Sequence, residues 1–171
     1  MQAILREHRK GAGVFVLSLT PRDGERHATD VGPFEHLDAR RAIEGEACAL
    51  AASRITDDQL DELESVLRAI QSGENYVSSE AADRQFHQLI AEATGNSIII
   101  DIVTSLWQTR ERSPQYRLLA DKAHEAGIGP VVDEHEMIFE ALKRRDAVAA
   151  RTAMRDHLSR VLETLLGRAH V

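Results

Sequence analysis

From Phe34 almost to the end of the chain, apolar residues recur at intervals of three and four, which places them on one face of an α-helix. The chain has only four prolines in 171 residues, so few positions interrupt this pattern. Each such helix must bury its apolar stripe against other helices. We therefore predict an all-α fold, an antiparallel bundle of six to seven helices joined by short connections.

Capping and breaking residues set the expected helix boundaries. Thr56 and Gln59 have the spacing of a capping box, Gly95-Asn96 closes a helix, and Pro114 ends or kinks one. The helices are expected at about 34–54, 56–73, 77–94, 97–114, 130–145 and 146–167, with 115–129 irregular or a short helix. The first helix is expected to bury Leu37, Ile43, Ala47 and Leu50. The fourth is apolar on several sides, which favours a central position.

Residues 1–33 differ from the rest. Gly11-Ala-Gly13 followed by Val14–Leu17 predicts a turn and a short β-strand, and the prolines and glycines of 20–33 indicate a linker. A lone hairpin is barely stable in water, so we expect this piece to belong to something larger. We divide the chain into residues 1–33 and a helical domain of residues 34–171.

Charge and cysteine content limit the possible partners. Residues 27–171 hold 16 Lys and Arg against 25 Asp and Glu, a formal charge of −9, which disfavours non-specific nucleic-acid binding. The single cysteine, Cys48, excludes an internal disulfide framework and fits a reducing compartment. No apolar run approaches the ~20 residues that span a bilayer. We expect a cytoplasmic protein with no membrane contact.

Four chemistry-bearing residues lie on inward faces of three expected helices. Asp83 and His87 are four residues apart and share a face with apolar residues. His135 and His157 each lie at helical spacing from apolar residues of their own helices. Because an unpaired buried carboxylate is costly, these side chains must be compensated, and they could converge on a divalent metal. Glu134, next to His135, is expected to project away from it.

The residues alone leave the use of this cluster open. One inward histidine is more often a satisfied core residue than a ligand, and the four together could form a hydrogen-bond network in a purely structural dimerisation domain. As a metal site, three imidazoles and one carboxylate suit zinc, nickel, manganese, cobalt or iron. An octahedral ion would keep two positions for the oxygens of a carboxylate. No H-E-x-x-H motif is present, and a metal-dependent enzyme acting on a small carboxylate is the alternative function. Five other histidines are expected to be solvated: His8, His27, His36, His124 and His170.

Longer motifs around these residues resemble a known family. Asp83-x-x-x-His87, Asp-Glu-His135-Glu-Met-Ile-Phe-Glu-Ala-Leu and Ala-Met-Arg-Asp-His157-Leu resemble the FCD effector domain of GntR-type transcription regulators, in the metal-binding branch of the FadR subfamily. The segment from Asp38 to Ala47 is similar to that family's opening pattern, with Asp in place of its first Glu. The resemblance covers about residues 34–168.

This resemblance implies a ligand sensor and not an enzyme. It implies a homodimer that binds a divalent transition metal, zinc or nickel first, through Asp83, His87, His135 and His157. The effector would be a small carboxylate or sugar acid. Residues 6–16 look like the wing of a winged helix-turn-helix domain whose recognition helix is missing from this chain. Contact with operator DNA is therefore expected only through a domain largely absent here.

Three arginines are candidates for contact with the effector. Arg40 matches a family position, and Arg110 and Arg112 follow the apolar part of the fourth helix near Trp107. A guanidinium can hold a carboxylate through two parallel hydrogen bonds. Trp107 itself is expected in the core or a dimer interface.

Overall fold

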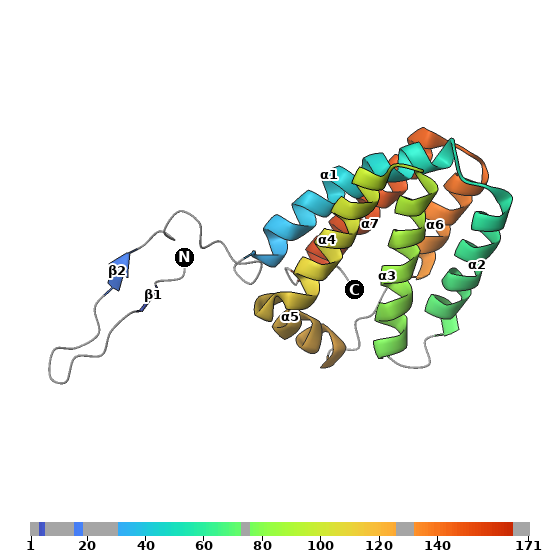
Figure 1. Cartoon of the computed structure of the whole chain (residues 1–171). Coiled ribbons are helices and arrows are strands. Elements are labelled where there is room, and N and C mark those ends of the chain that lie inside the picture. The colour runs from blue at the N-terminus through green and yellow to red at the C-terminus, as the bar shows by residue number, and fades with distance from the viewer. Residues whose placement is uncertain (1–3, 6–15, 19–30, 73–75, 126–131, 166–171) are drawn as a thin grey trace, which may run out of the picture.

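The computed structural model describes residues 4–5, 16–18, 31–72, 76–125 and 132–165 (Figure 1). Within these ranges the chain forms seven helices, which confirms the all-α prediction. They are α1 (Pro33–Ala52), α2 (Asp57–Ser72), α3 (Tyr76–Ala93), α4 (Ser97–Arg112), α5 (Pro114–Glu125), α6 (Val132–Lys143) and α7 (Ala147–Leu165). Residues expected to be irregular or a short helix, 115–129, contribute α5. The expected turn at 11–13 and most of the expected linker lie outside the described residues.

Two short strands precede the helices. β1 (Ile4–Leu5) pairs with β2 (Val16–Ser18) in an antiparallel ladder. The strand expected over residues 14–17 overlaps β2. Figure 1 draws this pair away from the helical bundle.

Local sequence explains most helix ends. Thr56 and Gln59 form the expected capping box, with each backbone N–H bonded to the other's side chain at 3.0 and 3.2 Å. The Asn96 side chain accepts hydrogen bonds from the first turn of α4, and Asp146 does the same for α7. Gly95 has a φ of +62°, the left-handed conformation that ends α3.

Helix α1 lies at the centre of the bundle and packs against α3, α4, α6 and α7. Small residues along α1 permit this close packing. A Cβ atom on Gly45 would stand 2.8 Å from Cγ of Arg155 on α7, so these two helices meet where α1 has no side chain. Helix α2 covers α3 and α6, and α5 packs on the end of α4.

Two expectations about these helices need correction. Helix α1 buries Leu37 and Ala47 as expected, but Ile43 and Leu50 are only half-buried, and its buried face also includes Arg40 and Glu44. Helix α4 lies at the side of the bundle, because α1 takes the centre. Ile98 on α4 is 68% exposed, and α4 buries mainly Val103 and Trp107.

The largest core cluster fills the space between α1, α2, α3, α6 and α7. Its fully buried members include Phe86, Ile90, Ile138, Leu142 and Met154. These residues share helix faces with the candidate ligands, so the core holds the site in place. No helix in the described part of the chain is both long and apolar enough to cross a bilayer.

Candidate metal centre

The bundle brings together the four residues singled out in the sequence. Asp83 and His87 come from α3, His135 from α6 and His157 from α7. Each offers one ligand atom, and these atoms all lie within 4.8 Å of one another. The three imidazoles are buried, and the ring centroids of His135 and His157 are 4.5 Å apart. One carboxylate and three imidazoles thus meet in the interior of the helical domain.

Asp83 is the carboxylate at the centre of this cluster. Its Oδ1 atom lies 2.9 Å from Nε2 of His135 and 3.6 Å from Nε2 of His87. Phe86, one turn from Asp83 on α3, packs edge-on against His135 with ring centroids 5.0 Å apart. The packing of Phe86 holds the His135 imidazole in position against the Asp83 carboxylate.

Two buried glutamates stand behind two of the imidazoles. Glu44 Oε2 lies 2.5 Å from His87 Nδ1, and Glu134 Oε2 lies 2.9 Å from His157 Nδ1. A carboxylate at Nδ1 favours a proton on that nitrogen and leaves Nε2 as a lone-pair donor for a cation. His87 and His157 are therefore oriented as metal-binding histidines usually are.

Each glutamate is in turn held by an arginine. Arg40 donates from Nε to Glu44 Oε1 at 2.6 Å, and both side chains are 3% exposed. Arg160 donates from Nη1 to Glu134 Oε1 at 3.2 Å. The result is two Arg–Glu–His chains that end at the same cluster. Pairing of every buried charge offsets the large penalty for removing it from water.

Neither glutamate was expected at the site from the sequence. Glu134 was expected to project away from His135, and it does, but it points to His157 on the neighbouring helix. Glu134 precedes the buried Ile138 by four residues, and Glu44 precedes the buried Cys48 by four. This spacing on a buried helix face was the available signal.

His36 also corrects an expectation. It was expected to be solvated, yet it is 3% exposed, and its Nε2 lies 2.7 Å from the carbonyl oxygen of Leu106. Burial lowers the pKa of His36, with a partial opposing effect from this backbone hydrogen bond.

Burial and nearby charges shift the pKa values of the cluster in different directions. Burial opposes ionisation of Asp83, but the hydrogen bond to His135 and the attraction of the nearby His87 outweigh it and hold the pKa of Asp83 well below its ordinary value. Burial lowers the pKa of His157 to about 4, although Glu134 partly opposes this. Burial also disfavours the charged form of His87, but Glu44 overcomes it and raises the pKa of His87. The cluster thus presents an ionised carboxylate and a neutral His157 at neutral pH, the forms that bind a cation.

The donor set fits a transition-metal ion. Imidazole nitrogens and one carboxylate oxygen are ligands that zinc, nickel and similar ions accept. Nε2 of His87 is buried and has no hydrogen-bond partner among the described residues. A buried nitrogen in that condition is unfavourable, and a shared cation would compensate it.

The three candidate arginines lie in different surroundings. Arg110 on α4 is near the cluster: its Nη1 lies 3.9 Å from Asp83 Oδ2, and its Nη2 lies 2.5 Å from Glu80 Oε1. Arg40 is buried with its guanidinium paired to Glu44 and stacked 4.2 Å from the centre of the Trp107 ring. Arg112, at the end of α4, is exposed.

Comparison with known proteins identifies the class. The FCD domain family matches residues 35–160, most of the helical domain. The chain therefore belongs to the FCD family of GntR-type transcription regulators.

Particular relatives agree with this assignment. The Exu regulon transcriptional regulator of Escherichia coli K12 is 34% identical over 157 residues, covering 89% of this chain and 60% of the relative. The Uxu operon transcriptional regulator of the same organism is 34% identical over 179 residues, covering 98% of this chain and 68% of the relative. The chain spans about three-fifths of the length of the Exu relative.

Solved structures show the same fold. E. coli McbR/YncC aligns with a TM-score of 0.64 at 20% identity, covering 82% of this chain and 68% of that one. Streptococcus agalactiae GntR aligns with a TM-score of 0.58 at 25% identity, covering 93% of this chain and 74% of that one.

If the cluster holds a metal, removing the ion should lower stability. Binding only to the folded state stabilises it, so we expect a strong chelator to lower the melting temperature by roughly 5–10 °C. Asp83→Ala should abolish this response. Asp101→Ala, which removes an exposed carboxylate of α4, is the matched control and should respond like the wild type. Equal chelator responses of wild type and Asp83→Ala in differential scanning fluorimetry would contradict the assignment.

The low pKa of His157 predicts how the metal-free protein responds to acid. The pKa is about 4 in the folded protein against an ordinary 6.5, so between these values the unfolded chain binds the extra proton. The free energy of unfolding should therefore fall as the pH is lowered from 6.5 to 4, by up to about 1.4 kcal/mol per pH unit from this group. Urea unfolding of chelator-treated protein measures this slope. His157→Gln should flatten it, and an unchanged slope would refute the prediction.

Proposed function

We propose that this chain is the effector-binding and dimerisation domain of a GntR-type transcription regulator, and that it binds a divalent transition metal and a small organic acid. The observation that carries the proposal is the meeting of Asp83, His87, His135 and His157 in one buried cluster, within 4.8 Å. Membership of the FCD family supports the regulatory role.

The metal we propose is zinc or nickel, with manganese, cobalt or iron as alternatives. All of these accept imidazole nitrogens together with a carboxylate oxygen. The buried glutamates behind His87 and His157 support firm orientation of the ligands, which suits an ion that stays bound while effectors exchange.

An organic acid, including a sugar acid, suits this environment for two reasons. Four protein ligands leave an octahedral ion two positions, which the oxygens of a carboxylate or hydroxycarboxylate can take. Arg110 lies beside the cluster, and its guanidinium can pair with a carboxylate. Arg40 supports the site indirectly through Glu44, and Arg112 is the weakest of the three candidates because its side chain is exposed.

The alternative is a metal-dependent enzyme acting on a small carboxylate. Such an enzyme needs a general base near the metal-bound water. Glu134 and Glu44 are engaged by histidine and arginine side chains, which supports their use in orienting ligands. The relatives carry the names of transcriptional regulators, which also favours the sensor.

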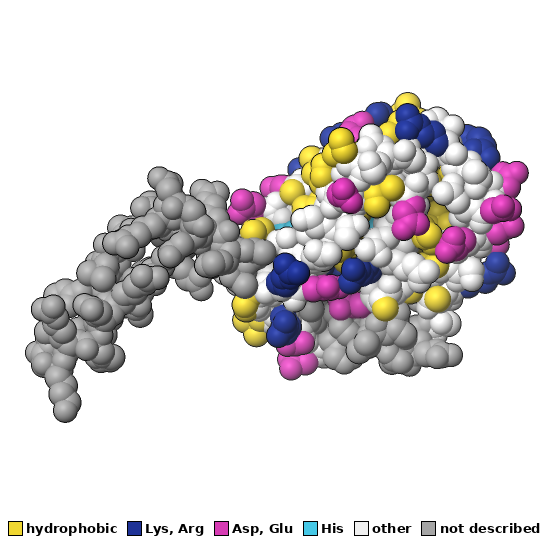
Figure 2. Space-filling view, in the orientation of Figure 1, with side chains coloured by type: hydrophobic (Ala, Val, Ile, Leu, Met, Phe, Trp, Pro, Cys, Tyr) yellow, Lys and Arg dark blue, Asp and Glu magenta, His cyan; other side chains and the backbone are white. Residues whose placement is uncertain are grey.

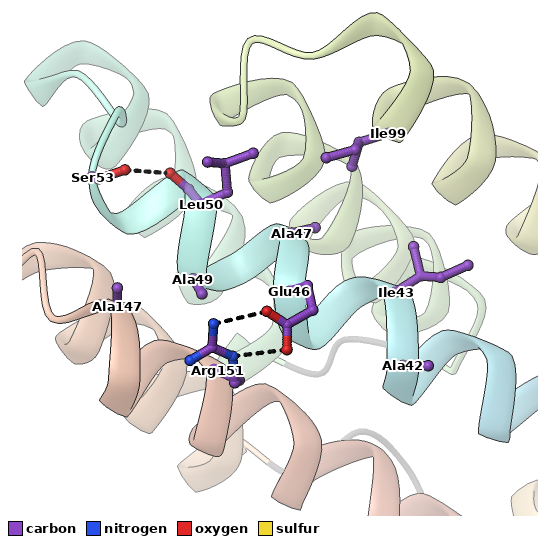
Figure 3. Close-up of a pocket in the computed structure, with 10 residues that line it drawn as sticks. All are labelled: Ala42, Ile43, Glu46, Ala47, Ala49, Leu50, Ser53, Ile99, Ala147 and Arg151. Carbon is purple, nitrogen blue, oxygen red and sulfur yellow. Dashed lines mark hydrogen bonds and ion pairs between the residues drawn. The ribbon is translucent and has the colours of Figure 1, made fainter.

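We propose that the chain dimerises through a groove lined by α1, α4 and α7 and through a ridge beside it, formed by Ile98 and Ile102 of α4. The groove has a volume of about 570 Å³ and is lined mainly by small and aliphatic side chains, including Ile43, Leu50 and Ile99 (Figure 3). Two more isoleucines of α4, Ile98 and Ile102, are 68% and 39% exposed beside it. Figure 2 shows apolar side chains on the upper part of the bundle, where Figure 1 places α1 and α4.

The partner we propose for this surface is a second copy of the chain. The charged residues lining the groove, Glu46 and Arg151, pair with each other at 2.7 and 2.8 Å, so they do not call for a charged partner. A twofold axis would place the α4 ridge of each copy in the groove of the other, because both features lie on one face. Operator DNA would then be bound by a paired winged-helix domain. That residues 1–33 are a remnant of this winged-helix domain stays a prediction.

Native mass spectrometry of freshly purified protein tests the effector site. We expect one divalent ion per chain and a retained organic acid. Arg110→Gln should lose the acid and keep the ion, because it removes the guanidinium beside Asp83, and Arg112→Gln should keep both. Protein without metal, or equal retention of the acid by both variants, would count against the proposal. Conversion of the acid into a product would favour the enzyme.

A charge in the apolar ridge should prevent dimerisation. Ile102→Asp would place a carboxylate in the proposed interface, so we expect light scattering coupled to size exclusion to report a dimer for wild type and a monomer for the variant. Met137→Asp, at a 54% exposed position on α6, is the matched control and should stay dimeric. Dissociation of both variants, or of neither, would refute this surface as the interface.

A further inference from the structure

Tyr116 anchors α5 to the bundle. It is 5% exposed, whereas Leu118 two residues later is 57% exposed. The Tyr116 ring lies between two other helices. It meets His36 of α1 edge-on, with ring centroids 5.4 Å apart, and the Arg110 guanidinium of α4 lies 5.1 Å from its centre. The position of α5 therefore depends on α1 and α4 together.

Arg110 touches both this anchor and the candidate metal centre. Besides its contact with Tyr116, the guanidinium lies 4.8 Å from the centre of the Trp107 ring. It also makes the ion pairs with Glu80 and Asp83 given above. A single side chain thus connects a candidate metal ligand with the helix that packs on the end of α4.

The same junction reaches the beginning of α1. His36 lies in the first turn of α1, and its Nε2 bonds to the carbonyl oxygen of Leu106 on α4. Ser113, between α4 and α5, donates from Oγ to the carbonyl oxygen of Val31 at 3.4 Å. Residues 31–36 are where the N-terminal segment joins the helical domain. A change in the contacts of Arg110 can therefore alter the packing of residues 31–36.

We propose that Arg110 couples occupancy of the metal centre to the packing of α5 and to the start of α1. This coupling rests on the proposed function. It is the route by which binding at the metal centre would change the packing of α5 and the start of α1. A cation at Asp83 would weaken the attraction between that carboxylate and Arg110. An anion on the ion would offer the guanidinium a new charge-assisted partner.

The contacts that must change are weak enough to respond. A cation–π contact is a modest interaction, so the stacking of Arg110 on Tyr116 can be outweighed by a carboxylate in a poorly solvated site. When Arg110 turns to the anion, Tyr116 loses its cation and α5 loses part of its attachment. His36 packs on the same ring, so the first turn of α1 changes with it. The contacts from Arg110 to Tyr116 and from Tyr116 to His36 are continuous, which gives the coupling a physical path.

Hydrogen exchange of the metal-free chain tests the junction first. In Arg110→Gln we expect amides 36–39 and 117–119 to exchange about fivefold faster than in wild type, the order expected for loss of a buried cation–π contact. Arg112→Gln removes the same charge from an exposed position and should leave both segments unchanged. Arg110→Lys, which keeps the charge, should give an intermediate increase. Wild-type exchange rates at these amides in a folded Arg110→Gln or Arg110→Lys variant would overturn the proposal.

Nickel ion is the probe for the second step. We expect Ni²⁺ to change exchange at 36–39 and 117–119 in wild type and to leave them unchanged in Arg110→Gln. Native mass spectra of the same samples report whether nickel is bound. Nickel bound to wild type with no change at these amides would overturn the coupling and leave the metal site standing. Failure to bind nickel would instead count against the metal site, and the metal-free comparison would still decide the junction.

Discussion

The pairing of buried charges is the interaction on which the rest of this structure depends. One aspartate, three histidines, two glutamates and Arg40 lie inside a small helical bundle, and none of them would be tolerated there alone. Their partners come from α1, α3, α6 and α7, so the helices must be in place before the charges are compensated. Removing one partner would leave another buried charge exposed to an apolar interior, which is usually more damaging than losing the contact itself. The same buried charge pairs therefore stabilise the helical bundle and build the candidate site.

The two Arg–Glu–His chains are not equivalent. The Arg40–Glu44–His87 series is closed to solvent, because the side chains of Arg40 and Glu44 are each 3% exposed. The chain that ends at His157 begins at Arg160, whose side chain is 56% exposed. Solvent therefore reaches one support of the cluster and not the other. The same side also contains Trp107, whose ring centre lies 4.2 Å from the Arg40 guanidinium and 4.8 Å from that of Arg110.

We propose three roles for helix α4 that its composition does not reveal. Its run of isoleucines favours a buried central helix, yet α1 occupies the centre because its small residues let neighbours approach closely. The isoleucines of α4 then remain at the surface, where we propose that a second copy covers them. The opposite end of α4 carries Trp107 and Arg110 toward the candidate metal centre. One helix therefore lies at the proposed dimer surface, at the proposed effector site and at the junction with α5.

The sequence by itself determined the helices, their caps and the inward positions of Asp83, His87, His135 and His157, because helical periodicity and capping are local properties of a chain. Family membership was also readable from the motifs around those residues. Only the tertiary structure decided that Glu44, Glu134 and His36 are buried and that α4 lies at the side. Periodicity tells which face a residue occupies, but it does not tell which helix covers that face. A glutamate among apolar residues looks like a break in the pattern until the fold brings the histidine that pairs with it from another helix.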